Sequence, residues 1–112
     1  MYFDRRWWGI HNMDWALYYL ERGQLLSVNA LLDRDFFFSQ DCAVTYPIMG
    51  AFTEFLISTY GIAQYKEFYQ AVDSRTALCD GYGCTVVEEF VNWLQLFRLD
   101  EGVKRRIKAL LA

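Results

Sequence analysis

Apolar residues recur at helical spacing along most of this chain, and one segment is apolar on almost every side. TYPIMGAFTEFLISTYG, residues 45–61, is interrupted only by a thin stripe of small or polar residues that includes Glu54. A helix that is apolar nearly all round belongs at the centre of a domain. Proline disfavours helical geometry at the residue before it, so we expect Tyr46 at the mouth of this helix and Pro47 in its first turn. The pattern predicts a central helix over about residues 46–60, ended by a glycine.

Capping residues and apolar spacing place further helices on both sides of this segment. We expect helices at about residues 13–22 capped by Asn12, 28–33 capped by Ser27, 62–72, 85–97 opened by a Thr85–Glu88 capping box, and after Asp100. Residues 33–40, which contain Phe36–Phe38, predict a turn or a short helical piece, and residues 73–83 a loop. Alternation typical of strands does not stand out, so no sheet is expected. The prediction is all-α: one domain over residues 1–112, a compact bundle of about five to six helices.

The composition indicates that the chain has a large apolar surface, which must be covered. Hydrophobic residues make up 54% of the chain and aromatic residues 19%, which requires either a dense core or a face covered by something else. Net charge is −3, which gives no electrostatic case for binding nucleic acid or an anionic membrane. The basic run at residues 104–106 with Lys108 fits a solvated face of a C-terminal helix.

The compartment of the protein stays open. No apolar run approaches the roughly 20 residues that span a bilayer, and the opening MYFDRRWWG lacks the apolar core of a secretory signal. We therefore expect either a cytoplasmic protein or a piece of a longer one. Cys79 and Cys84 bracket the loop CDGYGC and are placed to close a small ring under oxidising conditions. The odd total of three cysteines, which includes Cys42, favours free thiols.

Few residues suggest chemistry. His11 is the single histidine, which excludes a multi-histidine metal site built from this chain alone, and its place before a helix favours a surface or capping role. Glu54 is the acid that stands out, because its helix is otherwise apolar and a buried carboxylate is costly unless paired. We expect it to face solvent or a cation such as Lys66 or Arg75, with a functional carboxylate in a cleft as the alternative.

Two segments resemble a known family. YPIMGAFTEFLISTYGIAQYKEFY and YGCTVVEEFVNWLQLF resemble the C-terminal helical part of gluzincin zinc metallopeptidases, in particular bacterial proteins with a "peptidase MA-like" domain. The resemblance covers about Trp15 to Phe97. In that family two histidines of H-E-x-x-H and a further glutamate bind zinc, and a tyrosine stabilises the oxyanion.

The resemblance transfers one catalytic residue to this chain. It implies that Tyr46 is the oxyanion donor, whereas the zinc motif is absent, Asp14 is a loose match to the third-ligand position, and Pro47 replaces a glutamate of the aminopeptidase pattern. No cofactor is therefore expected in this chain.

Three functions remain open. The leading one is a non-catalytic helical domain that acts by protein contact, with a protein partner or self-association through an aromatic face, or as part of a larger protein. The first alternative is a fragment of a zinc metallopeptidase, with Tyr46 as donor and zinc held by a segment outside this chain. The second alternative is a binder of small apolar ligands, with a pocket lined by Trp7, Trp8, Trp15 and Phe36–Phe38.

Overall fold

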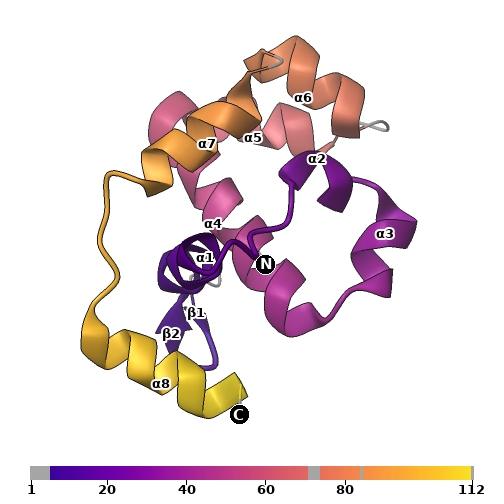
Figure 1. Ribbon diagram of the computed structural model, residues 1–112. Coiled ribbons are helices and arrows are strands. Elements are labelled where there is room, and N and C mark those ends of the chain that lie inside the picture. The colour runs from indigo at the N-terminus through magenta and orange to yellow at the C-terminus, as the bar shows by residue number, and fades with distance from the viewer. Residues whose placement is uncertain (1–5, 71–73, 84, 112) are drawn as a thin grey trace.

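The computed structural model describes residues 6–70, 74–83 and 85–111 and confirms the all-α fold (Figure 1). A short hairpin of β1 (Arg6–Trp7) and β2 (Ile10–His11) precedes the helices. Eight helices follow in the described residues: α1 (Asn12–Glu21), α2 (Val28–Leu31), α3 (Arg34–Ser39), α4 (Cys42–Tyr60), α5 (Ile62–Tyr69), α6 (Ser74–Tyr82), α7 (Val86–Leu94) and α8 (Glu101–Leu111). None of these described helices combines the length and hydropathy that a bilayer-spanning segment needs.

The longest helix, α4, is the central element, as the sequence predicts. It packs against α1, α2, α5 and α7. It begins at Cys42, because the carboxylate of Asp41 accepts a hydrogen bond from the Ala43 N–H at 2.9 Å and caps it. The expectation that the helix opens at Tyr46 with Pro47 in its first turn is therefore wrong. Both residues lie inside it.

A contact with α1 compensates the proline inside α4. Pro47 lacks the N–H that would bond the carbonyl of Ala43, four residues earlier. The hydroxyl of Tyr19 on α1 donates to that carbonyl at 2.9 Å, in a buried position. Burial raises the pKa of Tyr19 to about 12, so the hydroxyl keeps the proton that it donates. This hydrogen bond ties α1 to α4 and partly offsets the local cost of the proline.

The core consists of two hydrophobic clusters, and α4 contributes to both. In the first cluster Phe52 of α4 contacts Phe90 of α7 edge-to-face, with ring centroids 5.2 Å apart. In the second cluster Trp15 of α1 packs with Ile48 of α4 and Ile107 of α8, and all three are fully buried. Helix α1 also contributes to both clusters, whereas α7 belongs to the first and α8 to the second.

The hairpin is a feature that the sequence did not predict. Its turn consists of Trp8 and Gly9, both with positive φ of 52° and 77°, which is the backbone pattern of a type I′ turn. Each strand is two residues long, too short to produce the alternation from which a strand is recognised.

Helix α6 corrects the expectation of a loop at residues 73–83. Its apolar residues Leu78 and Tyr82, four apart, are buried against the first cluster, and this packing outweighs the helix-disfavouring Asp80 and Gly81. The expectation of free thiols is also wrong for Cys79, which is disulfide-bonded. Cys42 is a free, exposed thiol, and Cys84 lies outside the described residues.

Three caps differ from those expected, and one is Ser27, which occupies the N-cap position of α2 without a side-chain hydrogen bond. Thr85 precedes α7 without a side-chain cap, and its hydroxyl lies 3.4 Å from Glu89 instead of forming a capping box with Glu88. Asn12 is the first residue of α1 and is buried. Its side chain fills the space beside Gly50 of α4, where an added Cβ would lie 2.8 Å from the Asn12 Cγ. The small residue on α4 therefore allows α1 to approach closely.

Candidate functional site: an aromatic groove

An open cavity of about 320 Å³ lies between α4, α5 and the α2–α3 segment. We call it the aromatic groove and define it by its nine lining residues. These residues are Leu31, Leu32, Phe37, Tyr46, Met49, Thr53, Tyr65, Phe68 and Tyr69. All nine are uncharged, and five are aromatic.

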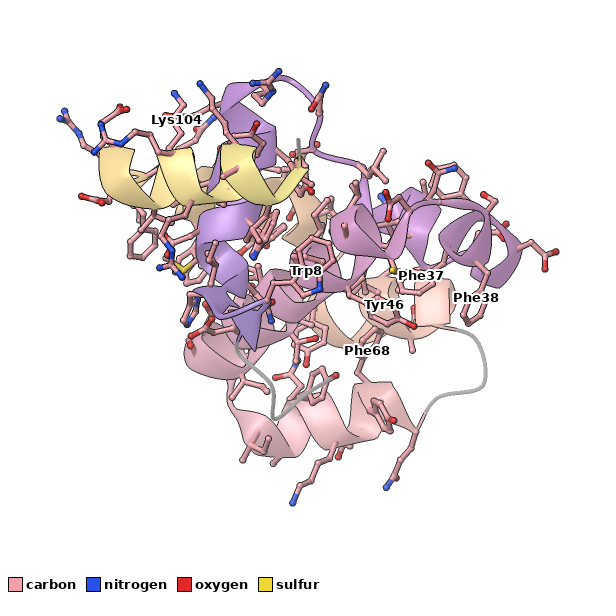
Figure 2. All side chains as sticks on the ribbon, turned by 90° about the horizontal axis from the view of Figure 1, so that it is seen from below. Trp8, Phe37, Phe38, Tyr46, Phe68 and Lys104 are labelled. Atoms are coloured by element: carbon pink, nitrogen blue, oxygen red, sulfur yellow. The ribbon has the colours of Figure 1, made fainter. Side chains whose placement is uncertain are left out.

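The α3 wall is positioned by a short-range cap. The carboxylate of Asp33 accepts a hydrogen bond from the Phe36 N–H at 3.2 Å and starts α3. The helix then directs Phe37 toward α4, where its ring meets that of Tyr46 edge-to-face at 5.4 Å between centroids. Figure 2 shows Phe37, Tyr46 and Phe68 close together, although they come from three different helices. This aromatic packing fixes one side of the groove.

The α5 wall follows from a glycine turn. Gly61 adopts a φ of 97° and separates α4 from α5, a conformation that L-residues with a side chain rarely adopt. The chain therefore turns sharply, and α5 places an aromatic stripe beside α4. Within this stripe the ring centroid of Tyr65 lies 6.2 Å from that of Phe68 and 6.1 Å from that of Tyr69.

The rim of the groove is unusually exposed for aromatic side chains. Phe38 on α3 is 66% exposed, and Tyr69 on α5 is 74% exposed. Phe38 also contacts Phe37 edge-to-face at 5.4 Å, so the exposed rim continues into the lining. Exposed apolar side chains gathered around a groove are typical of an interaction site.

Tyr46, the residue expected to be catalytic, lines this groove. It is the fifth residue of α4 and half-buried, so the physical argument that placed its hydroxyl at a helix mouth does not hold. Its role as an oxyanion donor stays a prediction. The other side chains that line the groove are aromatic, aliphatic or hydroxyl-bearing.

Glu54, the second candidate, lies outside the groove lining and faces the start of α1. Its Oε2 atom is buried and lies 3.5 Å from Nε2 of His11. The side chain of Arg75, one of the two cations suggested by the sequence, lies outside the described residues. Nδ1 of His11 accepts a hydrogen bond from the Met13 N–H at 3.2 Å. The capping role expected for this histidine is therefore confirmed.

This arrangement limits what the histidine and glutamate can do chemically. Because Nδ1 of His11 accepts the cap hydrogen bond, the neutral ring carries its proton on Nε2, which faces Glu54. Nδ1 therefore has a structural partner, whereas within the described part of the chain the buried Oε2 of Glu54 has no hydrogen-bond partner. Among the described residues, no group of three or more histidine, cysteine or acidic side chains is placed to hold a metal ion.

The residues expected to line a small-ligand pocket lie in several different environments. Trp15 is fully buried, stacked on Tyr19 and met edge-on by Trp8. The side chain of Trp7 lies outside the described residues. Of the expected lining residues, Phe37 lines the groove.

Sequence reasoning missed the α5 contribution to the groove. The apolar spacing predicts a helix at about residues 62–72, but not that Tyr65, Phe68 and Tyr69 on its apolar face line a groove. The width of the apolar face of this helix could have indicated the groove. Residues 68 and 69 are both aromatic and adjacent in sequence, so they widen the face beyond what contact with one neighbouring helix buries.

The comparisons with known proteins add no relative. Neither the family models, nor the curated proteins, nor the solved structures contain a match to this chain. The resemblance to gluzincin peptidases therefore gains no support from them, and the chain is assigned to no family.

Proposed function

We propose that this chain is a non-catalytic interaction domain that binds a protein partner through the aromatic groove. The observation that supports this proposal is the exposed rim formed by Phe38 and Tyr69 around an uncharged, largely apolar lining. Buried aromatic anchors dominate the energy of protein interfaces, and they cluster where water is excluded. A groove that already presents such side chains needs little rearrangement to bind.

The size of the groove indicates what enters it. A protein cavity of about 150 Å³ accommodates a benzene ring. The groove, at about 320 Å³, therefore has room for about two side chains of that size. This fits two apolar anchors from one partner segment, with Phe38 and Tyr69 packing against their edges.

The polar groups in the groove favour binding over catalysis. Its lining offers hydroxyl groups from tyrosines and Thr53 but no carboxylate, imidazole or ammonium group. The Thr53 hydroxyl donates to the Met49 carbonyl within α4 at 2.9 Å. General acid–base catalysis most often uses histidine or a carboxylate, and the His11–Glu54 pair lies outside this lining.

Site-specific photo-cross-linking in the cells that produce the protein tests this function. A benzophenone amino acid replaces Phe38 or Tyr69, and the matched control replaces Leu96, which is 79% exposed but lies outside the groove. We expect the same protein to be captured from both rim positions and not from the control. The signal from position 38 should disappear when Tyr69→Glu is added.

Two results would contradict the proposal. One is the absence of any protein adduct from both rim positions. The other is an identical set of adducts from the rim and from position 96, which would show that the groove confers no selectivity.

A further inference from the structure

We propose that the segment which enters the aromatic groove is the last turn of α8 from a second copy of this chain. The inference rests on the proposed function, because it names the partner of the same groove. In this contact Leu110 and Leu111 supply the two apolar anchors, and the basic residues of α8 face acidic residues beside the groove.

The last turn of α8 is apolar and incompletely buried. Ile107 is fully buried in the second cluster, whereas Leu110 and Leu111 are 43% and 41% exposed. These leucines continue the apolar face of α8 beyond the point where the fold covers it. Two such side chains match the two anchors for which the groove has room.

Charge is distributed unevenly between α8 and the rest of the chain. Residues 98–112 hold five basic residues and two acidic ones, a net charge of +3. The total charge is −3, so residues 1–97 carry −6. In α8, Nζ of Lys104 lies 3.4 Å from Oε2 of Glu21. The three basic residues that follow Lys104 in the same helix are Arg105, Arg106 and Lys108. The helix that presents the leucines is therefore strongly cationic for its length.

The surface beside the groove has the opposite charge. Asp33, Asp35 and Asp41 are all exposed and lie in or next to α3, the helix that carries Phe37 and Phe38. Arg34 offsets one of them, which leaves residues 33–41 with a net charge of −2. An uncharged groove next to an acidic edge is complementary to an apolar helix end flanked by basic residues.

The contact must form between molecules rather than within one. α8 packs on α1 and lies on a different side of the molecule from α3 and α5 (Figure 1). Figure 2 likewise shows Lys104 of α8 well away from Phe37, Phe38 and Phe68. One copy therefore has both a groove and a helix end that remain available to another copy, which is a heterologous contact.

Analytical ultracentrifugation over a series of protein concentrations tests the proposal. We expect the wild-type chain to self-associate. The helix-end variant Leu110→Glu/Leu111→Glu and the groove variant Phe38→Glu/Tyr69→Glu should each weaken association at least about tenfold. Leu96→Glu serves as the matched control and should associate like the wild type. All five positions are exposed, and thermal melting by circular dichroism verifies that the variants fold.

A mixing experiment makes the test specific. The helix-end variant keeps an intact groove, and the groove variant keeps an intact α8, so an equimolar mixture should form a 1:1 dimer although neither variant associates alone. Failure of the mixture to associate would overturn the proposed pairing. A wild-type chain that stays monomeric at all concentrations would overturn it as well.

The two proposals can fail separately. A monomeric wild-type chain whose rim positions 38 and 69 cross-link to a different protein refutes the second-copy partner and retains the groove as an interaction site. Absence of rim-specific adducts of any kind contradicts the interaction function itself.

Discussion

The hydrogen bond from Tyr19 to the carbonyl of Ala43 should stabilise the fold because Pro47 leaves that carbonyl without its helical donor. Tyr19→Phe removes the hydroxyl and keeps the ring. A buried acceptor that loses its donor costs about 1–3 kcal/mol. For a chain of 112 residues, unfolding entropies of roughly 2.1 cal/mol/K per residue make 1 kcal/mol equivalent to about 4 °C. We therefore expect the Tm to fall by about 4–13 °C.

The second half of this prediction concerns the proline. Pro47→Ala supplies a backbone N–H at the position from which a regular helix would bond Ala43. In that background the carbonyl has a donor within its own helix, so Tyr19→Phe should cost almost nothing. The two changes are thus expected to be coupled by about 1–3 kcal/mol, the same amount that Tyr19→Phe costs alone.

Urea unfolding of the four proteins in this double-mutant cycle, followed by circular dichroism, measures the coupling. Tyr69→Phe is a suitable control, since it removes an exposed hydroxyl and should change stability by no more than about 0.5 kcal/mol. If Tyr19→Phe is equally destabilising with and without the proline, to within about 0.5 kcal/mol, the explanation of how α4 tolerates Pro47 is refuted.

Three further predictions address other contacts. Gly50→Ala should destabilise the fold by roughly 1–3 kcal/mol in thermal or urea melts, because the added Cβ would collide with the Asn12 side chain. Adding Asn12→Ala should recover most of this loss, and a double variant that recovers no stability would contradict the collision as the cause. His11→Ala should cost about 1 kcal/mol through loss of the α1 cap, whereas His11→Asn should retain most of it; equal losses would speak against capping. Raising the pH from 8 to 11 should lower the unfolding free energy, because tyrosines of the unfolded chain ionise with a pKa near 10 while burial raises the pKa of Tyr19 and of Tyr82 to about 12 in the folded protein. Each of the two tyrosines contributes a loss of roughly 1.4 kcal/mol by pH 11. The Tyr19→Phe variant should therefore lose less stability over this pH range than the wild type.

Most of the helices could be predicted because capping residues and apolar spacing involve residues that are close together in the sequence. Asp100 caps α8 as expected, with its carboxylate accepting from the Val103 N–H at 3.2 Å. The apolar spacing of residues in α1 and α4 correctly indicated that both helices are buried. These features depend on residues three or four apart, which a single sequence shows directly.

The features that were mispredicted depend on residues far apart in the chain. The start of α4 was placed at about Tyr46, with Pro47 in its first turn, because a proline inside a helix is costly. The compensating hydroxyl comes from Tyr19, 24 residues before Ala43 in the sequence. Helix α6 was taken for a loop, since its burial against the first cluster is a tertiary contact.

The candidate site was harder to predict for the same reason. Periodicity predicts a helix at about residues 62–72, but it contains no information on whether a neighbouring helix covers the apolar face of that helix. The exposure of Tyr69 and the position of Phe37 against Tyr46 follow from the angles between α3, α4 and α5. Tyr46 was singled out from a resemblance to a metallopeptidase, and it lies in a groove lined by uncharged side chains.

The division of the core into two clusters has a consequence for how the native molecule opens. Among the described residues of α8, Ile107 is the one that is buried, and it belongs to the cluster that excludes α7. Burial of one isoleucine stabilises by about 1.5–3 kcal/mol, compared with about 5–15 kcal/mol for an entire domain. Native-state hydrogen exchange should therefore detect α8 as a separate opening unit, with amides that exchange before those of α1 and α4. The first cluster stays folded in that state, so the chain can release its basic helix without unfolding its centre.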